Sequence, residues 1–243
     1  MHVHRRHPAR RHLARDLPAR SSQAGVDKRH RAETRMSNLD QFKSDIARVF
    51  FSIPASHGYL LAGGGALLAS EISDRPTEDL DFFGHSETQD MAIVSRIFEL
   101  VASVQGWRTT PIRRAEEFVR LQVRGDETIT IDICRDVPPL LPINLTSDGP
   151  TFAGPELGGR KLLALFSRAE ARDFVDIFIL ANKFGRAVLT QSARELDAGF
   201  ASVPLRQALD RVSIYSDADL PIDRELVPAL REFFRDWAAG LSA

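Results

Sequence analysis

Hydrophobic residues follow two different patterns along this chain of 243 residues. From residue 59 to residue 134, short apolar or alternating runs typical of β-strands stand among helical segments. After Pro155 the apolar positions recur at spacings of three and four residues, which indicates amphipathic helices. The pattern therefore predicts an α+β protein, in which a mixed sheet with flanking helices is followed by a C-terminal helical lobe.

Five short segments in the first part of the chain are predicted to be strands. Gly125 and Asp126 separate the last two, and this pair of turn residues indicates a β-hairpin. The expected strands cover residues 59–62, 79–83, 108–112, 118–124 and 128–134.

Helices are expected before, between and after these strands in the sequence. The first covers residues 38–56, with Ser37 or Asn38 as its N-cap. A proline-rich stretch, residues 138–142, marks the change to the helical part, so we place the domain boundaries at 36–154 and 155–243. The other expected helices cover residues 66–72, 87–105, 156–167, 171–184, 191–198, 204–212 and 223–239.

Residues 1–35 differ from the rest of the chain in composition. They hold ten arginines or lysines and three acidic residues, a balance of +7, whereas the whole chain carries −1 and the remainder therefore −8. Such a segment is expected to be a disordered basic tail. A basic arm for a polyanion and a targeting peptide are two interpretations of it. We favour a third, in which Met36 is the natural start.

The composition otherwise fits a globular protein, with 43% hydrophobic and 27% charged residues. No apolar run approaches the roughly 18 residues of a membrane span, so we expect a cytoplasmic protein without membrane attachment. Cys134 is the single cysteine, which excludes an internal disulfide and fits a reducing compartment. It ends an alternating strand without a motif histidine beside it, so we expect a packed, inert thiol.

A strand that runs into Gly63, Gly64 and Gly65 and then into a helix favours phosphate binding. Glycines allow the backbone to approach an anion, and a helix N-terminus offers free N–H groups. The turn is not a Walker loop, because no Gly-Lys-Ser/Thr follows, and Leu68 replaces the third glycine of the dinucleotide fingerprint. By itself the glycine turn is a weak signal.

Asp79 and Asp81 lie two residues apart in the next expected strand, so their carboxylates share one face. Two carboxylates on one face repel each other unless a cation lies between them. Such oxygen ligands suit Mg²⁺, which keeps phosphate oxygens and waters in its other positions. An isolated Asp-x-Asp is more often a pair of solvated surface acids.

A second informative stretch, residues 161–177, covers two expected helices. Asp173 and Asp176 are one helical turn apart and share a face. Lys161 is a point charge suited to a triphosphate, and Arg172 suits either a phosphate or an ion pair. Spacing alone favours an ordinary surface cluster of ion pairs.

Together these stretches resemble the signatures of the AbiEii-like toxins, which include the MenT toxins, within the DNA polymerase β-type nucleotidyltransferase superfamily. The first signature, Gly-Gly-x-Ala-Leu and then Arg-x-Ser/Thr-x-Asp-hydrophobic-Asp, fits residues 63–67 and 75–81. The second, Lys-hydrophobic-x-Ala-Leu-x-x-Arg-x-x-x-Arg-Asp-hydrophobic-x-Asp-hydrophobic, fits residues 161–177 without a gap. Gly65 stands where many relatives have a hydroxyl residue, a difference expected to remove a side-chain contact to phosphate. The resemblance extends over residues 58–184.

The resemblance implies a nucleotidyltransferase core and a role for each matching residue. Asp132, in the alternating strand 128–134, corresponds to a third carboxylate that completes the metal site or acts as base; a structural aspartate is the alternative. The implied metal ligands are Asp79, Asp81 and Asp132. The implied catalytic residues are these three with Lys161 and Asp176. The implied nucleotide-binding residues are Gly63, Gly64, Gly65, Arg75, Thr77, Lys161, Arg172 and Asp173.

By the same resemblance the protein is expected to be the toxin of a toxin–antitoxin system. It would move a nucleoside monophosphate from an NTP, CTP by analogy, to an RNA hydroxyl, with Mg²⁺ or alternatively Mn²⁺ as cofactor. The 3′ acceptor end of tRNA is the expected target, and its modification blocks translation. The expected partners are a cognate antitoxin and tRNA, without DNA or a membrane, and a monomer is expected.

Other functions stay open at this stage. Nucleotidyl transfer to a small molecule or a protein hydroxyl is one alternative, and a catalytically idle module that binds a nucleotide or a partner is another. An RNA acceptor requires a basic surface, which arginines of the central strands could form. An ordinary solvated charged face is an equally good interpretation of these arginines. The candidate residues for that surface are Arg108, Arg113, Arg114, Arg120 and Arg124.

Overall fold

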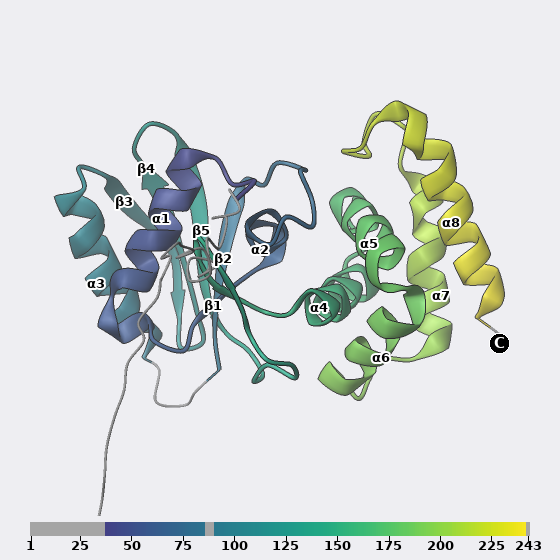
Figure 1. Cartoon of the computed structure of the whole chain (residues 1–243), viewed down its shortest axis with the longest axis horizontal. Coiled ribbons are helices and arrows are strands. Elements are labelled where there is room, and N and C mark those ends of the chain that lie inside the picture. Colours follow the sequence, from purple (N-terminus) through teal and green to yellow (C-terminus); the bar gives the residue numbers. More distant parts are fainter. Residues whose placement is uncertain (1–36, 86–89, 242–243) are drawn as a thin grey trace, which may run out of the picture. The chain divides into compact units, whose positions relative to one another are not determined.

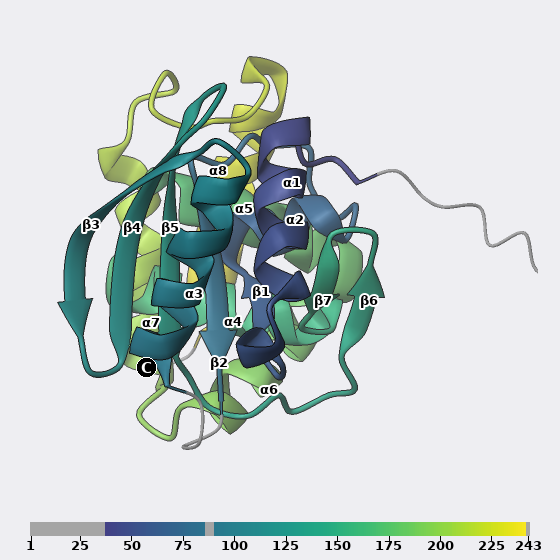
Figure 2. The ribbon, with the colours of Figure 1, turned by 90° about the vertical axis from the view of Figure 1, so that its left-hand side faces the viewer.

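Seven strands of the chain join into one mixed sheet, which confirms the expected fold class. A computed structural model of the protein describes residues 37–85 and 90–241. The strand order is β3-β4-β5-β2-β1-β7-β6 (Figure 2). The strands are β1 (Leu60–Ala62), β2 (Asp79–Gly84), β3 (Arg108–Ala115), β4 (Phe118–Arg124), β5 (Thr128–Arg135), β6 (Asn144–Thr146) and β7 (Gly149–Thr151).

The pairing of the central strands fixes the register of the candidate residues. β2 and β5 run parallel, as do β1 and β7, and the other pairs are antiparallel. β4 and β5 form the hairpin that Gly125 and Asp126 predicted, with Arg124 opposite Thr128. Buried residues of β2, β4 and β5 alternate with more exposed ones, so one face of these strands packs into the core.

Two helices cover that core face of the sheet, α1 (Gln41–Ser52) and α3 (Met91–Val104) (Figures 1 and 2). Neither Ser37 nor Asn38 caps α1, in contrast to the expectation. The cap is Asp40, whose Oδ1 accepts a hydrogen bond from the backbone N–H of Lys43 at 2.9 Å. Asn38 instead donates a side-chain hydrogen bond to the carbonyl of Ser73 at 3.1 Å. A short 3₁₀ helix, η1 (Pro54–Ser56), follows α1.

The glycine turn is itself helical. The three glycines form the first turn of α2 (Gly63–Ala69), which begins directly at the end of β1, three residues earlier than expected. The helix ends at Ala69 with Ser70 as its C-cap, and Glu71, the next residue of the connection to β2, has a φ of +52°.

The C-terminal part of the chain consists of helices, as the spacing predicted. Sequence-based prediction places the start of α6 five residues too late, because Gly185, at a φ of +90°, ends α5 and α6 begins at the next residue. The elements are α4 (Gly154–Ser167), α5 (Ala171–Phe184), α6 (Arg186–Leu196), α7 (Ser202–Asp210), η2 (Arg211–Ile214), η3 (Arg224–Leu226) and α8 (Val227–Gly240).

The hairpin of β6 and β7 has no counterpart in the predicted strands. Each strand is three residues long, and Pro150 interrupts the second, so neither shows the alternation that identifies a strand. β7 pairs with β1 through Leu61 and Thr151, which extends the sheet on the side away from β5.

Some expectations concern residues outside the described ranges. The basic segment 1–35, with the proposed start at Met36, and the first residues of the helix expected over 87–105 belong to them. None of the helices in the described ranges combines the length and the apolar character needed to cross a lipid bilayer.

Candidate active site

Three aspartates come together on neighbouring strands. Asp79 and Asp81 leave β2 on the same face, and the parallel register sets Asp132 of β5 directly beside Asp81. The alternation of each strand places these acids, and the pairing of β2 with β5 joins them into one cluster. Their roles as metal ligands and catalytic residues stay predictions.

Gly63 allows the carboxylate of Asp81 to lie against the first turn of α2. Its φ of +60° is one that residues with a side chain rarely adopt, and a Cβ there would lie 1.8 Å from Oδ2 of Asp81. Gly65 faces the other way, since a Cβ there would lie 2.7 Å from Cδ2 of Leu80. A larger residue at position 65 would therefore meet the core, and the expected loss of a phosphate contact stays a prediction.

The surroundings of Asp81 disfavour its charged form. They raise the pKa of its carboxyl to about 6. Burial is the largest cause, followed by the negative charge of Asp79 and, more weakly, of Asp132, while Lys161 and Arg172 oppose the shift. At neutral pH the ionised carboxylate is thus under repulsion that a bound cation would relieve.

Asp132 differs from its neighbours because one arginine holds both of its carboxylate oxygens. Arg120, its partner across the β4–β5 hairpin, donates Nε and Nη2 to the two carboxylate oxygens at 2.7 and 2.6 Å. Among the described residues, no group of three or more acidic, histidine or cysteine side chains is placed to hold a metal. Of the three aspartates, Asp79 and Asp81 are the ones without an arginine bound to both carboxylate oxygens.

On the helical side of the site, Asp176 of α5 binds two cations. Its Oδ1 and Oδ2 accept hydrogen bonds from Arg75 at 2.9 and 3.0 Å, and Lys161 of α4 lies 2.7 Å from Oδ2. The Asp176 side chain is fully buried. Burial alone would raise its pKa, but Lys161 and Arg75 outweigh burial and hold the pKa below its usual value. Asp176 thus holds two cations, Arg75 and Lys161.

Asp173 holds a different cation. Its oxygens accept hydrogen bonds from Nε and Nη2 of Arg168, both at 2.9 Å, and from the backbone N–H of Glu170 at 3.1 Å. The last contact belongs to a capping box at the start of α5. The side chain of Asp173, which was expected to bind the nucleotide, is fully buried and contacts Arg168, and the expected role stays a prediction.

Two further contacts connect the helices with the strand acids. Arg172 lies with Nη1 3.4 Å from Oδ2 of Asp79 and donates Nε to Glu170 at 3.0 Å. Thr77 donates its hydroxyl to Oδ1 of Asp79 at 2.8 Å. Asp79 is therefore oriented both from its own strand and from α5.

A small polar cavity of about 80 Å³ collects most of these side chains. Four residues that were expected at the site do not line it, namely Gly63, Gly65, Asp173 and Asp176. Arg120 and Arg168 line it although neither was singled out as a site residue. Arg168 stands in the second signature, and the hairpin register predicts Arg120 opposite Asp132. The lining consists of Gly64, Arg75, Thr77, Asp79, Asp81, Arg120, Asp132, Lys161, Arg168 and Arg172.

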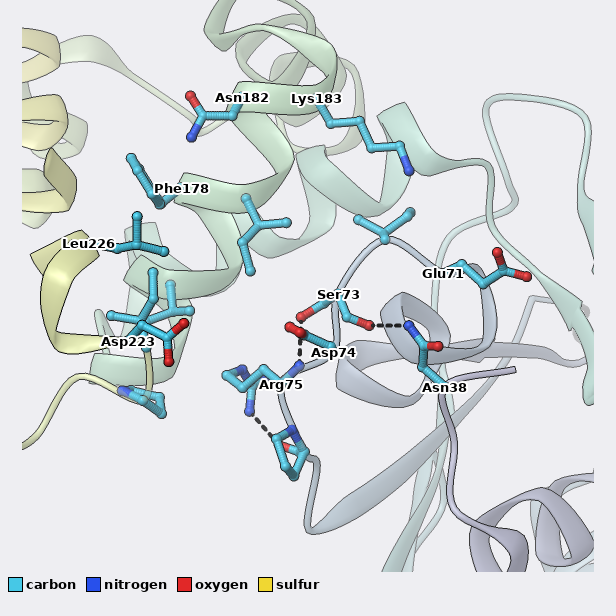
Figure 3. A pocket seen from close by; sticks show the side chains of 16 residues that line it. Asn38, Glu71, Ser73, Asp74, Arg75, Phe178, Asn182, Lys183, Asp223 and Leu226 are labelled. Atoms are coloured by element: carbon cyan, nitrogen blue, oxygen red, sulfur yellow. Dashed lines mark hydrogen bonds between the residues drawn. The ribbon is translucent and has the colours of Figure 1, made fainter. Parts of the chain in front are cut away.

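A larger cavity, of about 1170 Å³, lies beside the connection from α2 to β2 and shares Arg75 with the first. Figure 3 shows Ser73, Asp74 and Arg75 on one side of it and Phe178 of α5 with Leu226 on the other. Its lining is a mixture of apolar and scattered charged residues. The paired carboxylates and facing cations occur only in the smaller cavity, so we place the chemistry there.

Cys134 lies on β5 and is half-buried. Burial and the neighbouring charges of Asp81 and Asp132 raise the pKa of its thiol far above the usual value. The thiol is therefore protonated at neutral pH, in agreement with the expected inert cysteine.

Comparison with known proteins assigns the chain to a class of enzyme. Residues 46–241 match the sequence profile of the family described as nucleotidyl transferase AbiEii toxin, type IV toxin–antitoxin system. The chain belongs to this AbiEii nucleotidyltransferase toxin family, and it is a nucleotidyltransferase. Membership also implies a cognate antitoxin. No curated protein is matched by its sequence.

Solved structures share the fold at low sequence identity. JHP933 from Helicobacter pylori is 18% identical with a TM-score of 0.53, and the match covers 84% of this chain and 94% of that one. MenT4, a nucleotidyltransferase toxin from Mycobacterium tuberculosis, is 16% identical with a TM-score of 0.52, covering 83% and 90%. These structural similarities support the fold alone, and the class of reaction, nucleotidyl transfer, rests on the family match.

Proposed function

We propose that this toxin transfers a nucleoside monophosphate from an NTP, CTP by analogy with its relatives, to a hydroxyl of RNA, with the 3′ acceptor end of tRNA as the target. The observation that carries the proposal is the opposed charge around the small cavity. Carboxylates from β2 and β5 line it together with cations from α4, α5, β4 and the connection that follows α2. A triphosphate with its divalent cation has the matching distribution of charge.

The donor set fits Mg²⁺. Asp79 and Asp81 offer hard carboxylate oxygens on one strand face. Burial and, after it, the charge of Asp79 raise the pKa of Asp81, and a bound cation would offset both effects. Bound there, the ion would polarise the α-phosphate and favour the ionised form of an attacking hydroxyl. Asp132 would join it only after release from Arg120, with which both of its oxygens are now hydrogen-bonded.

The cations of the cavity suit the rest of the nucleotide. Lys161 and Arg75 are both held by Asp176, so they enter the site with little freedom to reorient. Arg168 and Arg172 add two guanidinium groups on the same side. In the transfer, the acceptor oxygen bonds to the α-phosphorus, the bond from that phosphorus to the β-phosphate oxygen breaks, and pyrophosphate leaves. The proton of the hydroxyl passes to the carboxylates of the cavity, and the cations stabilise the leaving pyrophosphate.

The proposal is tested by offering the purified protein each labelled NTP in turn with Mg²⁺ and total RNA. We expect a labelled band of tRNA size, strongest with one NTP, which disappears when EDTA removes the metal. Parallel reactions with protein and small alcohols as acceptors identify the acceptor class. Label that appears on these acceptors and not on RNA would contradict the proposal.

A growth assay links this chemistry to toxicity. Production of the wild-type toxin without its antitoxin is expected to halt growth, and the Asp81→Ala variant is expected to be harmless. If that variant inhibits growth as strongly as the wild type, the enzymatic basis of the toxicity is wrong.

A further inference from the structure

The arginines of the β3–β4 hairpin divide between the two faces of the sheet. Antiparallel pairing sets Arg108 beside Arg124 and Arg113 beside Arg120, with a bulge between Pro111 and Arg113. These four side chains are exposed on the face that carries the site acids. We call them the arginine strip.

Arg114 belongs to the other face, although it follows Arg113 directly. Its guanidinium donates hydrogen bonds to Ser95 at 2.9 Å and to Glu99 at 2.5 Å, both on α3. The structure thus removes Arg114 from the basic surface that the sequence suggested and provides a matched control on the same strand.

The arginine strip begins at the carboxylates. Arg113 and Arg120 lie in the same cross-strand row as Asp132 and Asp81. The row of Arg108 and Arg124 lies four residues further along β4, roughly 13 Å away at 3.3 Å per residue. The strip therefore extends from the site over a distance greater than the size of a single phosphate group.

Most of the strip's positive charge is not neutralised by the protein. Within residues 37–85 and 90–241, Arg108, Arg113 and Arg124 make no ion pair, whereas Arg120 is bound to Asp132. Glu117 and Glu127, at the ends of β4, pair with Arg135 and Lys43 instead. This concentration of free cations contrasts with the net charge of −8 carried by the chain after residue 35.

An aromatic ring stands where the strip meets the site. The guanidinium carbons of Arg113 and Arg120 lie 5.4 and 5.5 Å from the ring centre of Phe118. Cation–π contacts of this kind orient the planar guanidinium groups. Arginine planes and aromatic rings are surfaces on which unpaired bases stack, and arginines contact the phosphates between them.

We propose that the arginine strip binds the phosphate backbone of a single-stranded RNA and directs its 3′ end to the carboxylates of β2. The inference rests on the proposed function, because it assigns a surface to the acceptor of that reaction. Charge complementarity and direct continuity with Asp132 and Asp81 favour this partner over a protein.

The test compares an R108Q/R113Q/R124Q variant of the full chain with the wild type. Binding of a labelled single-stranded RNA is measured across a series of salt concentrations. At about 0.1 M salt we expect affinity about 100-fold lower, and the slope of log K against log salt smaller in magnitude by about 2, which corresponds to about 0.7 for each of three lost phosphate contacts. Binding of each NTP with Mg²⁺, measured by calorimetry, is expected to stay unchanged.

Two controls make the result specific. R114Q is expected to bind RNA like the wild type, because Arg114 faces α3. The charge-matched variant R194Q/R206Q/R211Q, altered at exposed helical positions, is expected to do the same. The proposal is overturned if the strip variant binds RNA like the wild type, if it loses only neutralisation by the antitoxin, or if the charge-matched variant loses as much affinity.

RNA labelling and RNA binding, measured on the wild type and the strip variant, distinguish a failure of this inference from a failure of the proposed function. A wild-type protein that binds RNA through the strip but labels no RNA with any NTP would contradict the proposed function and leave the strip as an RNA surface. A strip variant that binds and labels RNA at the wild-type rate would contradict the strip and leave the proposed function intact.

Discussion

The acids of β2, which line the small cavity, and the acids of α5, which hold cations that line it, are under opposite electrostatic conditions. Burial, and after it the acidic neighbours on its own strand and on β5, raise the pKa of Asp81 to about 6. Asp176 is fully buried, yet Lys161 and Arg75 hold its pKa below the usual value. The two aspartates are of one chemical kind, and only their neighbours differ.

The difference separates two uses of charge. An acid that is already paired with cations, such as Asp176 or Asp173, fixes the positions of those cations and has no oxygen free for a ligand. An acid placed among other acids is left for a ligand of opposite charge, at a cost in stability that the rest of the fold must offset. We therefore expect substitutions on β2 to affect chiefly activity, and those on α5 to affect stability as well.

Asp81→Asn is expected to give the largest loss of activity. Removal of one of the two carboxylates available to the metal should lower nucleotidyl transfer by about 1000-fold, or about 4 kcal/mol of transition-state stabilisation. Because the substitution also removes repulsion by Asp79 and Asp132, the unfolding temperature without divalent ions should rise by about 2–4 °C. Transfer assays and thermal unfolding measure both effects.

Added Mg²⁺ provides the control for this prediction. It should raise the unfolding temperature of the wild type more than that of the Asp81→Asn variant. A variant that is both inactive and less stable without metal would show that Asp81 is a structural acid, and the contrast with Asp176 would fail.

Asp176→Asn is expected to lower the free energy of unfolding by about 3–5 kcal/mol, because Arg75 and Lys161 are left as nearly buried cations without their partner. Activity should fall with it, since both cations lose their fixed positions. Urea denaturation of the wild type, D176N, K161M and the double variant measures the coupling. We expect K161M to restore part of the stability lost in D176N, and strictly additive losses would disprove the coupling.

Gly63→Ala is expected to have a smaller effect that is specific to the acidic side. A Cβ 1.8 Å from Oδ2 of Asp81 must displace the carboxylate, so transfer should fall by about 100-fold, equivalent to a little under 3 kcal/mol. Gly106→Ala is the matched control, because Gly106 also has a positive φ, +82°, but a Cβ there meets nothing within 4 Å. We expect the control to lose about 1 kcal/mol of stability and no activity. Equal activity losses in the two variants would show that backbone strain, and not the displaced carboxylate, is responsible.

The central strands and the acidic face of the site could be predicted well from the sequence. Alternation places Asp79 and Asp81 on one face, and the turn at Gly125 and Asp126 defines the register that sets Arg120 opposite Asp132. These features are local, because the period of a strand and the geometry of a tight turn depend on residues close together in the chain. The β6–β7 hairpin escaped prediction because its strands are too short to show a period.

The partners of the charged residues were decided by the tertiary structure. Periodicity shows that Asp173 and Asp176 share a helix face, but not that one binds Arg168 while the other joins Lys161 to Arg75, a residue 101 positions away. Nor does it show that Arg114 turns to α3.

By itself, then, the sequence determined the fold class, the faces of the strands and, through its two signatures, the class of enzyme. The packing of α4 and α5 against the sheet and the pairing of β4 with β5 decided which acids contact an arginine or lysine. The physical reason is that a repeat in the chain encodes which side of an element is buried, whereas an ion pair requires two elements to be brought together at one distance and orientation.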